Sequence, residues 1–182
     1  MKTLSNKMDY FELFEIPVQL KVDIAPLHKK FFELSRKYHP DYFANEKPEA
    51  QAEALEKSAM LNKAYKTFKN PDETIKYVLH QKGLLEEEEK YELPPDFLME
   101  VLEINEQLMD ADQPKADSQE SGVNTIQSTI NSLQSEIYEP VEGIVDHYQE
   151  GITSEKELLQ VKEYYYKKKY LDRIRRELAG KP

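Results

Sequence analysis

The stretch KYHPDYF, residues 37–43, lies directly after a lysine-rich segment with a helical pattern. Proline ends a helix and aspartate favours a turn, so His39, Pro40 and Asp41 predict a loop between two helices. The same residues would also suit a contact site, because a histidine and a carboxylate at an exposed turn are accessible to a partner. The segments on either side decide between a simple turn and a functional loop.

A helix with two distinct faces is predicted before this turn, and Asp23 is well placed to cap its start. Apolar residues recur at steps of three and four and form one buried stripe of Ile24, Leu27, Phe31, Leu34 and Tyr38. Four cations and the single acid Glu33 occupy the opposite face; the cations are Lys29, Lys30, Arg36 and Lys37. A solvated surface is the simpler interpretation, but the position before the turn favours a contact surface.

A second long helix is predicted after the turn, beginning near Pro48 because proline is tolerated in a first helical turn. It would run to about Lys69, where Asn70 and Pro71 break the pattern. Its buried stripe comprises Ala54, Ser58, Leu61, Tyr65 and Phe68. The two long helices would therefore form an antiparallel hairpin around the loop over residues 39–47.

Two short helices complete the first predicted unit. The segment DYFELFEIP, residues 9–17, would be capped by Asp9 and ended by Pro17. Another short helix is predicted over residues 72–81, with Gly83 as its C-terminal stop. We expect the first of these to pack across the hairpin.

A domain boundary is predicted at LLEEEEKYELPP, residues 84–95, because it combines a charge run with paired prolines. We expect four regions along the chain. They are a flexible N-terminus over 1–8, a first domain over 9–82, a linker over 83–91 and a helical bundle over 92–182.

Three helices are predicted in the second unit, which favours an antiparallel bundle. The first covers PDFLMEVLEINEQLMD, residues 95–110, and a polar loop over residues 110–120 follows it. The second has apolar residues at near-heptad spacing: Ile126, Ile130, Leu133, Ile137, Val141, Ile144 and Tyr148. The third would run from about Ser154 to Ala179, with a core of Val161, Tyr164, Leu171, Ile174 and Leu178. Pro140 should kink the second helix, and the sequence suggests no function for it.

The composition favours an all-α fold, since the 182 residues include only 5 glycines and show no sustained two-residue alternation. A formal net charge of -10 argues against broad binding to nucleic acid or anionic membranes. The chain has no cysteine, so it cannot itself hold an iron–sulfur cluster through sulfur. We found no secretion signal and no membrane-length apolar run, and therefore expect a cytoplasmic protein.

Taken together, the short aromatic helix, the basic helix, HPD at 39–41 and the following LNKAYKTF resemble the J domain of DnaJ-type co-chaperones. The resemblance covers residues 9–77. It implies a DnaK-type chaperone partner whose ATP hydrolysis is stimulated through His39, Pro40 and Asp41. The basic helix of such domains docks on an acidic surface of the chaperone, and Lys29, Lys30, Arg36 and Lys37 match that helix.

A catalytic role for His39 and Asp41 is the alternative, because a histidine can act as a base that an aspartate orients. The sequence marks no serine or cysteine nucleophile, no glycine-rich phosphate loop and no second histidine at a metal-ligand spacing. We therefore predict no enzymatic activity, no metal and no cofactor.

The helix over residues 95–110 has more apolar surface than one neighbour needs. Its core stripe comprises Phe97, Val101, Ile104 and Leu108. Leu98, Leu102 and Met109 lie about a third of a turn away, and Met99 lies further round. These residues either pack against a second neighbour or form an exposed patch with an acidic rim, which would suit partner recognition.

A J domain joined to a bundle that opens with FLMEVLEINEQL, residues 97–108, is similar to the HscB family of iron–sulfur cluster assembly. The family's bundle holds the scaffold protein IscU and delivers it to the chaperone. The resemblance implies a scaffold-binding face of Leu98, Met99, Leu102, Glu103, Glu106, Asp110 and Tyr170. Pro140, the polar loop and the tyrosine–lysine cluster around Tyr170 depart from the pattern. The cysteine zinc module of eukaryotic members is missing, which favours a bacterial origin.

We therefore predict a monomeric, non-enzymatic adaptor between a DnaK/HscA-type chaperone and an IscU-type scaffold. A J-domain co-chaperone for a different client is the first alternative. A purely structural helical protein, in which HPD is only a turn, is the second.

Overall fold

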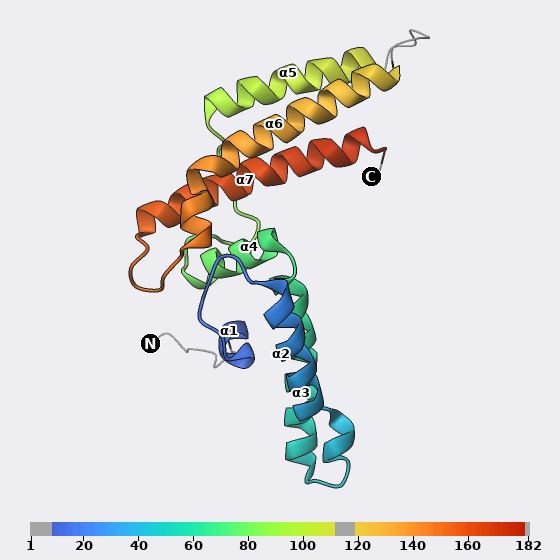
Figure 1. Ribbon diagram of the computed structural model, residues 1–182, viewed down its shortest axis with the longest axis vertical. Helices are drawn as coiled ribbons and strands as arrows, with labels where there is room; N and C mark the ends of the chain where they lie inside the picture. Colours follow the sequence, from blue (N-terminus) through green and yellow to red (C-terminus); the bar gives the residue numbers. More distant parts are fainter. Residues whose placement is uncertain (1–8, 112–118, 181–182) are drawn as a thin grey trace. The chain divides into compact units, whose positions relative to one another are not determined.

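The computed structural model describes residues 9–111 and 119–180 of the chain. Every regular element within these two ranges is helical, and the chain divides into two compact units (Figure 1). Unit 1 comprises Met1–Gln81 with Tyr148–Ile152, and unit 2 comprises Lys82–His147 with Thr153–Pro182. The predicted all-α class is confirmed, while the boundaries of the domains and of the linker stay predictions.

Unit 1 contains α1 (Tyr10–Phe14), α2 (Ile24–Lys37), the 3-10 helix η1 (Pro40–Phe43), α3 (Pro48–Phe68) and α4 (Pro71–Gln81). Helices α2 and α3 lie side by side as a hairpin, with η1 in the connection between them (Figure 1). The Asp23 carboxylate caps α2 by accepting a hydrogen bond from the backbone N–H of Ala25 at 3.1 Å. The predicted hairpin is therefore confirmed.

The five-residue helix α1 is held in place by α4. The Asp9 carboxylate caps α1 by accepting from the backbone N–H of Phe11 at 2.9 Å. The same carboxylate accepts from the Tyr77 hydroxyl at 3.1 Å and from the Gln81 amide at 2.7 Å. The Tyr77 ring stacks on Tyr10 with centroids 4.5 Å apart, and burial raises the pKa of Tyr77 to about 12. Such contacts are needed because a single helical turn is unstable in isolation.

Two local predictions in unit 1 are wrong. Helix α1 ends at Phe14 rather than at Pro17, because Glu15 adopts a left-handed φ of 54° that cannot continue the helix. Ile24, predicted to belong to the buried stripe, has 46% of its surface exposed. It occupies the first position of α2, whereas Leu27 and Leu34 further along the helix are buried.

Unit 2 is a bundle of α5 (Pro95–Ala111), α6 (Gln119–Asp146) and α7 (Glu155–Leu178). All three helices contribute to one buried cluster of Phe97, Val101, Ile104, Ile126, Ile130, Leu133, Leu171 and Ile174. The stripes predicted for these helices therefore meet in a common core. Tyr148 is an exception, because it lies beyond the end of α6, whose last buried apolar residue is Val145.

The segment that precedes α5 is packed against α7, although it was predicted as a linker. Leu85 is buried, and the Glu89 carboxylate accepts a hydrogen bond from Lys162 at 2.5 Å. This bond lowers the pKa of Glu89. Tyr91 stacks on Tyr166 with ring centroids 4.4 Å apart. The charge run in this segment therefore includes at least one carboxylate with a structural role.

Helix α6 continues through Pro140, which lies within its bounds. Proline has no N–H, so the carbonyl of Glu136 cannot receive the usual bond from residue 140. Figure 1 shows α6 bending toward its C-terminal end, as the prediction of a kink requires.

The start of α7 is stabilised by a capping box between Ser154 and Glu157. The Ser154 hydroxyl accepts from the backbone N–H of Glu157 at 3.3 Å, and the Glu157 carboxylate accepts from the Ser154 N–H at 2.8 Å. We expect Ser154→Ala to lower the free energy of unfolding of unit 2 by about 1 kcal/mol. Thermal unfolding followed by circular dichroism would measure it.

Ser128→Ala is the matched control for this capping prediction, because Ser128 is exposed inside α6 and caps no helix. It should not lower the melting temperature, because alanine has a higher helix propensity than serine. An equal effect of the two substitutions would show that loss of a serine hydroxyl, rather than loss of the cap, lowers stability.

Candidate functional site

The HPD turn is a short 3-10 helix whose backbone is closed by local hydrogen bonds. His39 is the N-cap of η1, and its Nδ1 accepts from the backbone N–H of Asp41 at 3.3 Å. The backbone N–H of Tyr42 donates to the carbonyl of His39 at 3.1 Å. Pro40 follows the cap, where its fixed φ suits a helical start. The three residues thus build one rigid turn.

Gln51 in the first turn of α3 ties the rest of the loop down. Its side-chain amide donates to the carbonyl of Ala44 at 3.2 Å and to the carbonyl of Glu46 at 2.9 Å. Sequence analysis missed this residue, and no sequence signal would have found it, because a surface glutamine is compatible with any exposed helix position. The second half of the loop is therefore fixed to the first turn of α3.

His39 and Asp41 are accessible at the surface. Their side chains are 53% and 89% exposed, and the His39 Nδ1 lies 3.6 Å from the Asp41 Oδ2. A catalytic base oriented by aspartate would donate its Nδ1–H to the carboxylate, whereas here Nδ1 accepts from a backbone amide. The geometry of this turn therefore suits contact with a partner rather than general-base chemistry.

The predicted basic face of α2 is only partly free. Lys30 forms ion pairs with Glu15 at 2.6 Å and with Glu33 at 3.5 Å, and Lys37 lies 3.9 Å from Glu15. The hydrogen bond from Lys30 lowers the pKa of Glu15 and raises the pKa of Lys30. This pairing was not predicted from the sequence. Glu15 is the C-cap of α1 and lies 15 residues before Lys30, so only the packing of α1 against α2 brings the two side chains together.

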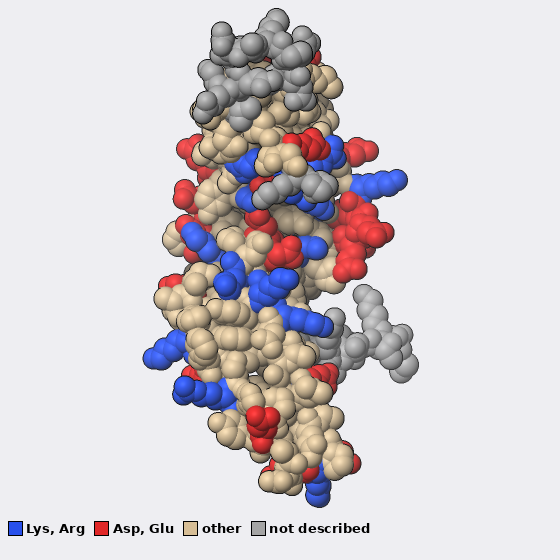
Figure 2. Space-filling view, turned by 90° about the vertical axis from the view of Figure 1, so that its right-hand side faces the viewer, with Lys and Arg blue, Asp and Glu red and all other residues tan. Residues whose placement is uncertain are grey.

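Lys29 and Arg36 remain exposed and form no ion pair with any residue in the described ranges. Acidic and basic side chains are interspersed with uncharged ones on one face of the molecule, so the sign of the surface varies locally (Figure 2). Lys57 on α3 lies 5.2 Å from the ring centroid of Tyr38, but its ammonium is paired with Glu53 at 2.6 Å, so it adds little positive charge to this surface. Lys37 lies at the same distance from that ring.

The second candidate site is the exposed apolar side of α5. Leu98, Met99, Leu102 and Met109 are 44%, 69%, 57% and 73% exposed. They do not pack against a second neighbour, so the alternative in which Leu98, Leu102 and Met109 belong to the core is wrong. Their neighbours Glu103 and Glu106 are also exposed. We call Leu98, Met99, Leu102, Glu103 and Glu106 the α5 face.

Tyr170 on α7 is only half-buried and borders the bundle core. Its ring meets Phe97 edge-on with centroids 6.4 Å apart, and the Arg173 guanidinium lies 5.2 Å from its centroid. One side of the ring is therefore committed to packing against α5. The side chain of Asp110 lies outside the described residues, so its predicted place beside the α5 face stays a prediction.

Metal ligands and membrane spans were also considered. Among the residues described, no group of three or more His, Asp or Glu side chains is arranged to hold a metal ion. None of the helices within 9–111 and 119–180 combines the length and the apolar character that crossing a membrane requires.

The chain is similar to known proteins over nearly its whole length. Residues 93–179 match the family described as the HSCB C-terminal oligomerisation domain. The co-chaperone protein HscB homologue of Photobacterium profundum is 36% identical over 104 residues, which span 57% of this chain and 61% of that protein. Chaperone HscB from Vibrio cholerae superposes with a TM-score of 0.69 at 27% identity, over 94% of this chain and 96% of that one.

Residues 93–179 belong to the HscB C-terminal domain family, and nearly the whole chain is similar to HscB chaperones. Human co-chaperone protein HscB also superposes, with a TM-score of 0.73 at 26% identity, over 96% of this chain and 82% of that one. The family match covers unit 2, and the solved HscB structures extend the likeness to nearly the whole chain. The predicted architecture, an N-terminal J domain joined to a three-helix bundle, is thereby confirmed.

Proposed function

We propose that this chain is a non-enzymatic co-chaperone that couples a DnaK/HscA-type chaperone to an IscU-type iron–sulfur scaffold. The supporting observation is that one HscB-like chain carries two accessible surfaces, the turn at 39–41 and the α5 face. The relatives are named as chaperones or co-chaperones, not as enzymes. The chain binds no cofactor in this proposal, and the cluster chemistry stays on the partners.

The HPD turn acts on the chaperone by favouring its hydrolysis-competent conformation. A ligand shifts a conformational equilibrium only by its difference in affinity for the two states, so the turn must bind the competent state more tightly. His39, Pro40 and Asp41 supply a rigid, exposed contact for this purpose. Lys29, Lys30, Arg36 and Lys37 assist by electrostatic steering toward an acidic chaperone surface.

The α5 face receives the scaffold through apolar contacts bordered by acids. Methionine and leucine adapt to a partner surface, while Glu103 and Glu106 select for a partner with basic residues at the rim. Asp110 and Tyr170 complete the proposed contact. Because both partners are held by one chain, the scaffold is presented at a raised effective concentration. A cytoplasmic location follows from the thiolate-bound cluster of the scaffold, which requires a reducing compartment.

The decisive experiment measures single-turnover ATP hydrolysis by the chaperone with this chain, with the scaffold, and with both. Stimulation by this chain, increased further by the scaffold, supports the proposal. Stimulation without scaffold binding would favour a different client. No stimulation would leave only a structural helical protein. Light scattering of the same samples measures whether the chain acts as the proposed monomer or assembles, as the description of its C-terminal domain family suggests.

The pairing of Glu15 with Lys30 and Lys37 makes a prediction about the rate of chaperone binding. Glu15→Gln removes the negative charge that both lysines contact, so the α2 surface becomes more positive. We expect association with the chaperone to become roughly two- to threefold faster at low salt and to return to the wild-type rate at high salt. Stopped-flow measurements at both salt concentrations would test it.

Glu12→Gln is the matched control for the rate measurement. It removes the same charge from α1, but Glu12 forms no ion pair within the described residues. Faster association by the same factor in both variants would mean that net charge alone sets the rate, with no specific role for Lys30 and Lys37.

A further inference from the structure

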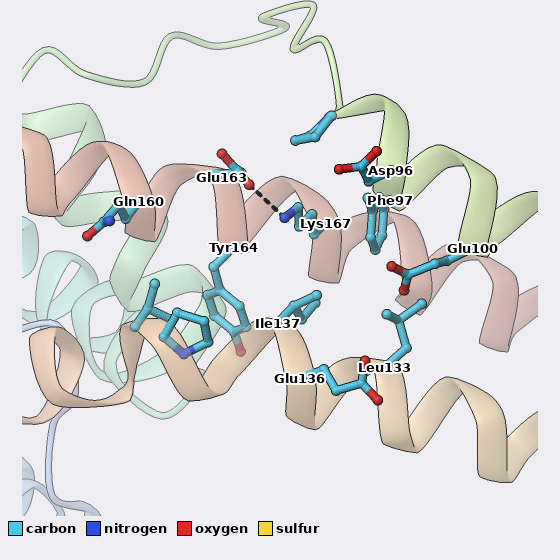
Figure 3. A pocket seen from close by; sticks show the side chains of 13 residues that line it. Asp96, Phe97, Glu100, Leu133, Glu136, Ile137, Gln160, Glu163, Tyr164 and Lys167 are labelled. Atoms are coloured by element: carbon cyan, nitrogen blue, oxygen red, sulfur yellow. Dashed lines mark ion pairs between the residues drawn. The ribbon is translucent and has the colours of Figure 1, made fainter.

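A groove opens between the three helices of unit 2. Its volume is about 450 Å³, within the range of sites that hold ligands. The floor is apolar, as the side chains in Figure 3 show, and is formed by Phe97, Leu133, Ile137, Val141 and Tyr164. Four of these five side chains are buried in the core of the bundle, and Ile137 is the partly exposed one, so packing holds the floor in place.

Four carboxylates surround this apolar floor. Asp96 and Glu100 come from α5, Glu136 from α6 and Glu163 from α7. The lining contains one cation, Lys167, which is already paired with Glu163 at 2.6 Å. Asp96, Glu100 and Glu136 form no ion pair with any residue that the structure describes. The groove therefore has an unbalanced negative rim.

Pro140 also lines this groove, together with Glu136. Because Pro140 has no N–H, the backbone carbonyl of Glu136 is left without its usual helical donor. A proline within a helix normally costs several kcal/mol, as it removes a hydrogen bond and bends the chain.

Leu98 and Leu102 of the α5 face lie on the flank of α5 opposite the groove, whereas Glu103 lies close to it and lines a second hollow with Glu100, Leu133 and Glu136. Leu98 and Leu102 each follow a groove carboxylate, Asp96 and Glu100, by two positions. Two positions in an α-helix correspond to a rotation of roughly 160° by the shorter way. Leu98 is 44% exposed on its own flank and does not line the groove. A molecule in the groove would therefore leave Leu98 and Leu102 accessible.

We propose that the groove binds a linear segment of a partner protein that carries lysine or arginine on both sides of one apolar residue. The apolar side chain would cover Ile137 and Pro140, which keep exposed surface in the groove, and the flanking cations would pair with Asp96, Glu100 and Glu136. Leu98, Met99 and Leu102, the apolar residues proposed to contact the scaffold, do not line this groove, so the proposal holds even where the scaffold binds elsewhere.

The test uses the full chain and a fluorescein-labelled heptapeptide with a central leucine between two pairs of lysines. Fluorescence anisotropy at low salt should show saturable binding. We expect Glu100→Gln with Glu136→Gln to weaken the Kd roughly tenfold, since two charge pairs are lost. The matched control, Glu139→Gln with Glu142→Gln, makes the same charge change on residues of α6 that do not line the groove, and should leave the Kd unchanged.

Two further measurements separate the groove from general electrostatic attraction. A peptide with glycine in place of leucine should bind far more weakly, and nuclear magnetic resonance shifts should appear at Ile137 and Tyr164 but not at Met99. Equal binding of the two peptides, equal weakening by both variant pairs, or shifts centred on Met99 would each overturn the proposal. Self-association of the chain through the groove, lost in the Glu100→Gln, Glu136→Gln variant, would also overturn it in favour of a second copy as the occupant.

Discussion

His39→Gln should reduce stimulation of the chaperone ATPase to background while leaving the fold of unit 1 intact. The imidazole is 53% exposed, and its hydrogen bond is a single long one, 3.3 Å from the N–H of Asp41. Loss of such a bond should change the free energy of unfolding by less than about 1 kcal/mol. A partner-buried contact at the centre of an interface contributes about 2 kcal/mol or more, which corresponds to roughly thirtyfold.

The measurement is ATP turnover by the chaperone as the co-chaperone concentration rises. A variant that has lost only affinity will reach wild-type stimulation at high concentration, whereas one that cannot favour the competent conformation will reach a lower plateau. We expect the lower plateau for His39→Gln and for Asp41→Asn. Asp41 is 89% exposed, so its effect cannot arise from a change in the fold.

Asn45→Ala is the control in the same loop, because Asn45 is exposed and lies outside the tripeptide. It should stimulate like the wild type. Full stimulation by His39→Gln at every concentration would remove the J-domain function from this chain. A lowered melting temperature in His39→Gln alone would indicate instead that the histidine supports the loop.

The order and limits of the helices could be predicted well from local patterns. Asp23 and Pro48 mark the starts of α2 and α3, because capping and first-turn preferences depend on neighbouring residues alone. Burial of Leu27, Leu34 and Leu61 follows from the spacing of apolar residues in the same way. The capping box at Ser154 was also visible in the sequence as a serine followed three residues later by a glutamate, although we did not predict it.

Contacts between distant segments could not be predicted, and they change the interpretation of the first site. Nothing near Lys30 in the sequence indicates that Glu15 will pair with it, since that depends on how α1 packs beside α2. The predicted linker shows the same limit, because Glu89 contacts Lys162 on α7. Local sequence predicts which residues are charged, but only the packing decides which charges remain free for a partner.

The α5 face illustrates the opposite case, in which the fold resolves an ambiguity left by the sequence. Spacing alone allowed Leu98, Leu102 and Met109 to pack against a second helix. The core of the bundle is instead filled by Phe97, Val101 and Ile104, and the three residues remain exposed. The scaffold-binding role of the α5 face stays a prediction, but the structure leaves its apolar side chains accessible.

Met99→Ala with Leu102→Ala is expected to weaken scaffold binding by about 2–3 kcal/mol, or roughly 30- to 150-fold, without lowering ATPase stimulation. Complete burial of a methionine or leucine side chain is worth about 1.5–3 kcal/mol, and these two start 69% and 57% exposed, so part of that value is gained on binding. Isothermal titration calorimetry with the scaffold would measure the affinity. Single-turnover ATPase without the scaffold would measure the J-domain function of the same sample.

Two controls make the result of this double substitution specific. Ile152→Ala with Leu159→Ala truncates exposed apolar residues outside the α5 face, and should leave the affinity unchanged. Val101→Ala truncates a side chain that is only 2% exposed, so it should lower stability by about 1–3 kcal/mol. If Met99→Ala with Leu102→Ala behaves like Val101→Ala, lowering the melting temperature but not the affinity, the two residues stabilise the bundle and the scaffold binds elsewhere. Loss of affinity at an unchanged melting temperature requires a partner that covers these side chains, because most of their surface is in contact with water in the isolated chain.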